Sequence, residues 1–335
     1  MKAGKLPLDL LTKLLQTIPN EDPRVVVGPK SGEDAAVIDM GGHYLVTKTD
    51  PITFATDLVG WHVVQINAND LAVMGATPKW FMSTLLLPEG TSEKQISSIF
   101  QQISKACTDL GITLVGGHTE ITYDFPRPIA IGCMLGEVDK ENVIFTSNAS
   151  PGDSIILTKG IAIEGTSILA NEYSTELLGK GVSKNLIQNA SNFLLSPGIS
   201  VVKDAQIAQS SANIHSMHDP TEGGIATGLL EIATAADVGL QVYLEKIPIL
   251  DECQAFCNAL GINPLGLIAS GALLATLPKP EVPELIRSME KHRIPVFEIG
   301  QITPQVDGIQ LIVSGEALEL PEFERDELAR WLSED

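Results

Sequence analysis

Apolar residues in the first half of the chain alternate in some segments and recur every three or four positions in others. Residues 33–39 and 43–50 alternate on either side of a Met-Gly-Gly turn, which predicts a β-hairpin. We expect a helix next, capped by Asp57 and ending near Met74. This order predicts an α+β domain whose sheet is covered by helices on one face. The remaining expected elements are a strand at 80–87, a helix at 92–110, a strand at 112–115 leading into two glycines, and a strand at 128–138.

The second half begins after the turn-rich sequence NASPGDS, residues 148–154. We therefore expect two domains, 1–148 and 149–335, each long enough to bury a core. In the second domain helices alternate with strands, which predicts an α/β or α+β domain with a mixed sheet. The expected helices lie at about 164–173, 198–209, 225–236, 281–291 and 321–333, and the expected strands at about 155–159, 213–218, 239–244, 271–277, 295–300 and 308–313.

Composition and charge narrow the classes of function. The 335 residues are 44% hydrophobic and 19% charged, as in globular proteins, and no run of about 18 apolar residues predicts a membrane span. The net charge of −20 disfavours nucleic acid and anionic membranes as partners, because like charges repel. ATP is also anionic, so an acidic enzyme that uses ATP needs metal ions or local lysines.

Two further features indicate a cytoplasmic protein. The sequence LPLDLLTKLL, residues 6–15, has helical spacing, so we expect an amphipathic helix and no signal peptide. Four cysteines are too few for a disulfide scaffold of this length. Cys253 and Cys257 lie four residues apart and predict a buried thiol pair rather than a zinc site.

Four acidic residues in the first half stand beside glycines, small residues or element ends: Glu33, Asp34, Asp50 and Asp70. Carboxylates held in this way are typical ligands of divalent cations, which often bridge to the phosphates of a nucleotide. Glu33 and Asp34 are neighbours on a strand and serve one site only if the backbone bends at Gly32. A solvated strand start for this pair and a turn acceptor for Asp50 are the alternatives.

Asp70 has the least ordinary position of the four. It falls on the apolar stripe of the helix that ends near Met74, and Asn67 shares that face one turn earlier. A carboxylate on a buried face needs a cation or hydrogen bonds.

Two glycine-rich segments are candidates for binding an anion. Gly116 and Gly117 precede His118 and Glu120, and glycines at a strand exit can present N–H groups to a phosphate. The sequence HDPTEGG, residues 218–224, precedes a helix, whose start Asp219 or Thr221 caps and whose N-terminus attracts anions. The chain contains no P-loop, no Gly-x-Gly-x-x-Gly and no Gly-x-Ser-x-Gly motif, which argues against P-loop NTPases, Rossmann dehydrogenases and α/β-hydrolases.

Six segments in this order resemble the superfamily of aminoimidazole ribonucleotide (AIR) synthetase: GEDAAVI, TDPIT, NDLAVMGA, GGHTEIT, PGDSIILTKGIAIEGT and HDPTEGG. That superfamily, called PurM-like, includes thiamine-monophosphate kinase, selenophosphate synthetase and the hydrogenase maturation factor HypE. The resemblance covers nearly the whole chain. It implies an N-terminal ferredoxin-like sheet domain, which forms a barrel with its copy in a homodimer, and a C-terminal α/β sandwich domain. It also implies ATP in a cleft, with Mg²⁺ held by acidic residues.

The resemblance assigns roles to individual residues. Asp34, Asp50 and Asp70 match acidic metal-binding motifs, and Glu33 stands where most relatives have the first aspartate of Gly-Asp-Asp. The implied nucleotide contacts are Gly116, Gly117, His118, Asp219, Thr221, Gly223 and Gly224, with His118 in place of the more usual carboxylate. We add Lys48 and Lys159 as candidate phosphate contacts, with solvated lysines as the alternative reading.

The C-terminal sequence LARWLSED separates this chain from HypE. HypE uses a C-terminal cysteine to carry a carbamoyl group, and no cysteine follows Cys257 here. The chain looks most like an AIR synthase-related, HypE-like subgroup. We therefore expect ATP- and Mg²⁺-dependent phosphorylation or activation of a small molecule by a phosphotransferase or ligase-like enzyme. The alternatives are a thiamine-monophosphate kinase and a non-catalytic ATP-binding accessory protein of a maturation complex.

Overall fold

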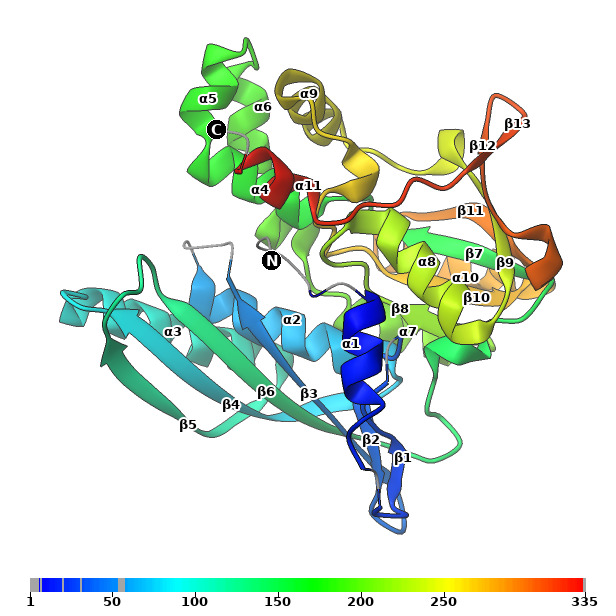
Figure 1. Cartoon of the computed structure of the whole chain (residues 1–335), viewed down its shortest axis with the longest axis horizontal. Coiled ribbons are helices and arrows are strands. Elements are labelled where there is room, and N and C mark those ends of the chain that lie inside the picture. Colours follow the sequence, from blue (N-terminus) through cyan, green and yellow to red (C-terminus); the bar gives the residue numbers. More distant parts are fainter. Residues whose placement is uncertain (1–5, 7, 20, 31, 54–57, 334–335) are drawn as a thin grey trace. The chain divides into compact units, whose positions relative to one another are not determined.

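The computed structural model describes residues 6, 8–19, 21–30, 32–53 and 58–333 (Figure 1). The expected helix cap Asp57 lies outside these residues. The chain divides into two compact units. Residues 20–28 and 34–143 form the N-terminal unit, and residues 1–19, 29–33 and 144–335 form the C-terminal unit. No helix in the described part of the chain is both long and apolar enough to cross a membrane.

The N-terminal unit is a six-stranded sheet with the order β1-β2-β3-β6-β4-β5. Neighbouring strands are antiparallel except β4 and β5, which are parallel. Helices α2 and α3 pack together, and α2 covers the face of β3, β6 and β4 (Figure 1). The elements are β1 (Val25–Val27), β2 (Ala36–Asp39), β3 (Tyr44–Ile52), α2 (Val59–Val73), β4 (Thr77–Pro88), α3 (Glu93–Leu110), β5 (Thr113–Thr122) and β6 (Ile129–Val138).

Strand alternation builds the core of this unit. Phe81 of β4 pairs with Met134 of β6, which pairs with Lys48 of β3, and Val46 lies two residues before Lys48 on the same face. Val46, Phe81 and Met134 are fully buried on this helix-covered face. The intervening residues of each strand point to the open face. Helix α3 starts at a capping box between Ser92 and Gln95, in which each side chain satisfies a backbone N–H of the other residue.

The C-terminal unit contains a seven-stranded sheet with the order β13-β12-β9-β11-β7-β10-β8. Among the described strands of this sheet, β12 and β9 run parallel and the other neighbouring pairs are antiparallel. The strands are β7 (Asp153–Thr158), β8 (Ser216–His218), β9 (Gly239–Tyr243), β10 (Leu274–Pro278), β11 (Val296–Thr303), β12 (Ile309–Val313) and β13 (Glu316–Glu319). The helices are α1 (Leu8–Leu15), α4 (Ile163–Glu172), α5 (Ser174–Gly179), α6 (Lys184–Ala190), α7 (Val202–Ser211), α8 (Gly224–Ala236), α9 (Asp251–Leu260), α10 (Val282–Lys291) and α11 (Glu327–Trp331).

Helices cover both faces of strand β7. Ile155 and Leu157 share a buried apolar cluster with Ile225 and Leu229 of α8. Thr158 points to the opposite face and donates a hydrogen bond to Asp204 of α7, so α7 lies on that side. The fold is thus the mixed two-sheet architecture that the sequence predicts.

Several elements differ from the sequence-based expectation. Strand β5 does not end before the glycine pair but continues to Thr122, because it pairs with β4 along its whole length. Helix α7 starts at Val202 rather than near residue 198, after a separate turn of helix at Leu194–Gly198 that contains a proline. Helices α5 and α6 and strand β13 were not expected, since their segments are short and weakly periodic.

Candidate functional site

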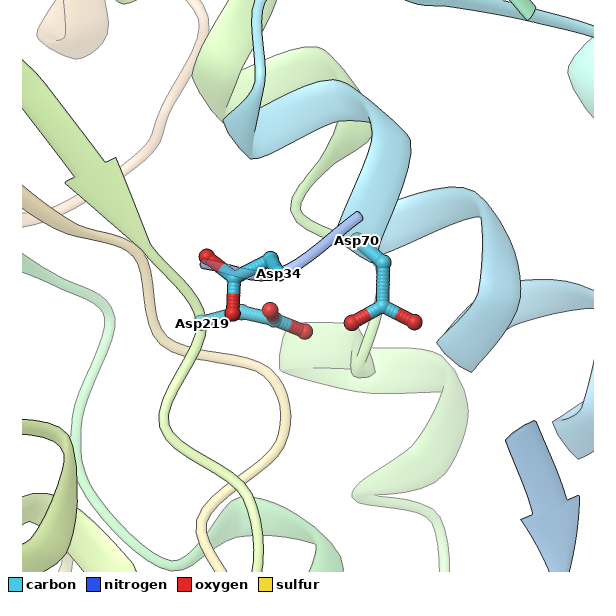
Figure 2. A group of neighbouring side chains, drawn as sticks. All are labelled: Asp34, Asp70 and Asp219. Carbon is cyan, nitrogen blue, oxygen red and sulfur yellow. The ribbon is translucent and has the colours of Figure 1, made fainter. Parts of the chain in front are cut away.

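Two buried aspartates meet in the N-terminal unit. Asp34 precedes β2 and is 9% exposed, and Asp70 lies in α2 and is 3% exposed. One carboxylate oxygen of Asp34 lies within 4.8 Å of a carboxylate oxygen of Asp70 (Figure 2). Figure 2 also draws Asp219, which belongs to the C-terminal unit.

Strand β3 contributes a lysine and a third carboxylate to the same face. Lys48 and Asp50 are two residues apart, so both point toward α2. The Lys48 Nζ lies 3.3 Å from Asp70 Oδ1 and 3.7 Å from Asp50 Oδ2. The register of β3 and the packing of α2 thus bring together residues that are widely separated in the sequence.

Asn67 joins α2 to β3 beside these residues. Its Oδ1 accepts a hydrogen bond of 2.9 Å from the Asp50 N–H, and its Nδ2 donates to the Asp50 carbonyl at 3.2 Å and the Val63 carbonyl at 2.8 Å. A Cβ at Gly132, opposite Asp50 on β6, would lie 2.3 Å from the Asn67 amide nitrogen. Asn67 therefore holds the backbone of Asp50, a role that its fully buried position in α2 makes possible.

This group of residues fits a divalent cation. Carboxylate oxygens are the hard ligands that Mg²⁺ prefers, and two of the three carboxylates are buried. A cation bound here would replace or supplement Lys48 as the partner of Asp70.

The carboxylate of Glu33 accepts hydrogen bonds within the C-terminal unit. Its Oε2 accepts from the Thr146 N–H at 3.1 Å, and its Oε1 accepts from the Ser147 hydroxyl at 2.7 Å and the Ser147 N–H at 3.4 Å. These donors belong to the 3₁₀ turn Thr146–Asn148, in the C-terminal unit with Glu33. Gly32 has a φ of +90°, which supplies the bend before this residue. The role of Glu33 as a metal ligand stays a prediction.

The segment Gly116 to Glu120 lies inside β5. His118 pairs with Thr84, which continues to Ile131 and Pro51, a register line on the open face of the sheet. Its Nε2 lies 3.3 Å from Glu120 Oε2, and both side chains are exposed. The sheet therefore separates His118 from Lys48 and Asp50, which point to the helix-covered face.

Gly116 and Gly117 have different environments. Gly117 has a φ of +151°, and a Cβ there would lie 2.0 Å from the Ser83 carbonyl oxygen. No atom lies within 4 Å of a Cβ built at Gly116. Gly117 is thus required for the close approach of β4 and β5. Contact of either glycine with a nucleotide stays a prediction.

The turn 219–224 connects β8 to α8 in the C-terminal unit. Asp219 is 2% exposed, and the Thr221 carbonyl accepts from the N–H groups of Gly224 and Ala269 at 3.0 and 3.1 Å. Gly223 and Gly224 have φ angles of +81° and +67°. The two consecutive left-handed residues make glycine the residue that fits this turn.

Asp326, a residue that the sequence analysis missed, lies against this turn. Its Oδ2 accepts from the Gly223 N–H at 2.8 Å. Burial raises the pKa of Asp326, its two backbone hydrogen bonds lower it, and the nearby carboxylates Glu222 and Glu164 raise it, so that the net pKa is about 7. The sequence signal was an aspartate directly before the helix-forming residues ELARW.

Lys159 is buried inside the C-terminal unit. Its Nζ donates to the Ser200 carbonyl at 2.8 Å and lies 3.1 Å from Asp204 Oδ2, which also accepts from the Thr158 hydroxyl at 2.8 Å. Burial lowers the pKa of Lys159, and the negative charge of Asp204 opposes that shift. The alternative of a solvated lysine therefore does not apply, and contact with a phosphate stays a prediction.

Comparison with known proteins identifies the family. The family model described as AIR synthase related protein, N-terminal domain, matches residues 32–138, and the model of the C-terminal domain matches residues 150–311. The chain belongs to the AIR synthase related protein family. The two matches together cover most of the chain, including Asp34, Asp50, Asp70 and Asp219.

Three curated relatives have similar length. A putative hydrogenase expression/formation protein of Methanocaldococcus jannaschii is 27% identical, over 88% of this chain and 87% of the relative. The carbamoyl dehydratase HypE of Rhizobium leguminosarum bv. viciae is 26% identical, over 78% and 74%. A selenide, water dikinase of Clostridium botulinum is also 26% identical, over 91% and 94%.

Solved structures share the fold. A HypE–HypF complex has a TM-score of 0.73 at 20% identity and covers 93% of this chain and 98% of that chain. ThiL complexed with AMPPCP and TMP has a TM-score of 0.70 at 20% identity, with 95% of each chain covered. HypE in complex with ATP has a TM-score of 0.69 at 21% identity, with 90% of each covered. At these identities the likeness establishes the fold alone.

Proposed function

We propose that this protein binds ATP with Mg²⁺ and phosphorylates or otherwise activates a small molecule. The observation that carries the proposal is the pair of buried carboxylates, Asp34 and Asp70, with Lys48 beside them. Solved relatives named as complexes with ATP and with AMPPCP support the choice of nucleotide. We also propose that the functional domains are residues 1–148 and 149–335.

The residues of the N-terminal unit have distinct parts in this proposal. Asp34, Asp50 and Asp70 would hold Mg²⁺, and Asn67 orients Asp50 through its backbone. When bound, Mg²⁺ offsets the charge of the phosphates and of the transition state for phosphoryl transfer. Lys48 balances the charge of Asp70 in the metal-free protein and is available to a phosphate once a cation has taken that place.

The nucleotide contacts remain part of the proposal. We assign them to Gly116, Gly117 and His118, to the turn 219–224, and to Lys159. The Lys159 ammonium group can contact a phosphate only if it leaves Ser200 and Asp204. Otherwise the phosphate would bind a backbone N–H near Lys159. Glu33 is included among the metal ligands on the basis of its position in the Gly-Glu-Asp motif.

Two alternatives have specific support. Thiamine-monophosphate kinase activity is suggested by the structure named as ThiL with AMPPCP and TMP. It predicts ADP formation when thiamine phosphate is added. A non-catalytic role as an ATP-binding subunit is suggested by the HypE–HypF complex, and it predicts tight ATP binding without turnover.

We further propose that two copies of this chain associate through the open face and edge of the N-terminal sheet. Strand β5 is an edge strand, exposed along nearly all its length, and it carries Leu114, Val115 and Ile121 at 41%, 53% and 51% exposure. Exposed apolar strand edges are typical of association surfaces. Light scattering on the wild type and on Val115→Lys tests the proposal, which predicts a dimer that the substitution weakens.

Nucleotide binding with and without Mg²⁺ tests the main proposal. Isothermal titration with a non-hydrolysable ATP analogue should show Mg²⁺-dependent binding that Asp70→Ala weakens by at least about tenfold. Asp109→Ala is the matched control, because it removes an exposed carboxylate of α3 in the same unit. Unchanged affinity in Asp70→Ala would contradict the metal-site assignment.

A further inference from the structure

The C-terminal segment, residues 320–331, is packed against two loops of its own unit. The ring of Phe323 covers Gly266 so closely that a Cβ at that glycine would lie 2.6 Å from ring atoms. The carboxylate of Glu327 accepts from the Asn263 N–H at 2.8 Å. The segment is therefore packed into the C-terminal unit and hydrogen-bonded to it.

Asp326 stands at the centre of this segment and is 3% exposed. Its Oδ1 accepts from the Leu328 N–H at 2.8 Å and so caps helix α11. Its Oδ2 accepts from the Gly223 N–H at the same distance, across 103 residues of sequence. One carboxylate thus joins the end of the chain to the turn 219–224.

The backbone of the turn 219–224 has a conformation that favours glycine at residues 223 and 224. A Cβ at Gly223 would lie 2.2 Å from the Thr227 hydroxyl, and one at Gly224 would lie 2.3 Å from the Leu265 carbonyl. Glycine fits here, but it loses more conformational freedom on ordering than any other residue. The hydrogen bond from the Gly223 N–H to Asp326 restricts this freedom at the residue before α8, and it is strongest above pH 7, where Asp326 is ionised.

We propose that Asp326 is a positioning residue for the turn 219–224, which it holds in the conformation that receives the nucleotide. The inference rests on the proposed function for the contact with nucleotide, but the bond from Asp326 to Gly223 stands by itself. In this view residues 320–331 support the turn 219–224.

Two substitutions separate this role from general destabilisation. Asp326→Asn keeps the size of the side chain but offers one acceptor oxygen to two N–H groups, and Asp326→Ala offers none. Ser183→Ala is the control, because Ser183 caps α6 through the Leu186 N–H and has no link to the turn. At pH 8, where Asp326 is ionised, loss of its hydrogen bond to Gly223 should speed amide hydrogen exchange at residues 223–227 about tenfold in Asp326→Asn and further in Asp326→Ala. Ser183→Ala should leave it unchanged.

Nucleotide binding supplies the second measurement on the full-length variants. A fluorescent ATP analogue with Mg²⁺ should bind about tenfold more weakly to Asp326→Asn than to the wild type and equally well to Ser183→Ala. Wild-type-like exchange at residues 223–227 in Asp326→Asn would overturn the proposal, and so would faster exchange with unchanged affinity. If the wild type binds no nucleotide, the proposed function fails, while the exchange data still decide whether Asp326 holds Gly223.

Discussion

The ammonium group of Lys48 lies 3.3 Å from a carboxylate oxygen of Asp70, 22 residues further along the chain. Asp70 is nearly fully buried, whereas Lys48 retains a quarter of its side-chain exposure. The pair joins β3 to α2 on the helix-covered face of the N-terminal sheet. In the cation site that we propose here, Lys48 is a positive partner of Asp70 when no metal is bound.

Replacing Lys48 should make the free energy of unfolding depend on the presence of Mg²⁺. Lys48→Met leaves the buried carboxylate of Asp70 without its cation, and we expect a loss of about 1–3 kcal/mol in EDTA, discounted for the partial exposure of the pair. Millimolar Mg²⁺ should restore most of it. Urea unfolding with and without Mg²⁺ measures the effect. Lys105→Met, which removes an exposed partner of Asp109, should change little in either condition. A loss in Lys48→Met that Mg²⁺ does not reverse would contradict the cation site.

Asn67→Ala should both destabilise the protein and weaken the proposed metal site. The substitution leaves the N–H and carbonyl of Asp50 without their partner, at a cost of about 2–4 kcal/mol. Because the Asp50 backbone then loses its anchor, Mg²⁺-dependent nucleotide affinity should also decrease. Unfolding and titration measure the two effects. Asn258→Ala, at an exposed position of α9, serves as the control.

The two adjacent glycines of β5 should respond differently to alanine. Gly117→Ala puts a Cβ into the Ser83 carbonyl at a positive φ, and we expect a loss of more than about 2 kcal/mol. Gly116→Ala meets open space and should change stability by less than about 1 kcal/mol. Urea unfolding of both variants tests the pair. Equal losses would mean that β4 and β5 do not approach as closely as described.

Removing one partner of the buried ion pair Lys159–Asp204 should lower the free energy of unfolding more than removing both charges. Lys159→Met leaves a buried, uncompensated carboxylate and should cost about 3–5 kcal/mol. Adding Asp204→Asn removes that charge and keeps an acceptor for the Thr158 hydroxyl, so we expect recovery of part of the loss. Thermal or urea unfolding of the single and double variants checks this. A double variant that is less stable than Lys159→Met would contradict the assignment of the cost to an unpaired charge.

Asp326 should make the protein less stable as pH rises toward neutrality. Its pKa is about 7 in the folded protein against 3.8 for an ordinary aspartate, so between these values the folded state binds the proton and the unfolded state does not. Its contribution is therefore fully present below pH 4 and is lost as pH rises through 7. Between pH 5 and pH 8 the loss is about 3 kcal/mol at most.

Asp326→Asn provides the comparison for the pH effect. Asparagine does not titrate, so the difference in unfolding free energy between wild type and variant should shrink as pH rises from 5 to 8. Glu164 and Glu222 are the carboxylates that face this group, and both are present in the two proteins. A difference that is constant over this range would show that Asp326 does not bind a proton in the folded state near neutrality.

The sequence determined the family, the order of most elements and the acidic residues of the N-terminal unit. These features are local: residues within one motif share a strand end or helix face, and burial follows periods of 2 and 3.6 residues. For this reason the hairpin of β2 and β3, the buried face of α2 and the position of Asp70 follow from short stretches of sequence.

Tertiary structure alone decided which of these residues meet. The register of β3 and the packing of α2 place Lys48 beside Asp70, while the pairing of β5 with β4 places His118 on the opposite face of the sheet. Glu33 turns to its own hydrogen-bond donors, and Asp326 reaches Gly223 across 103 residues. Such contacts depend on sheet register and on the packing of distant segments, which no local period of the sequence encodes.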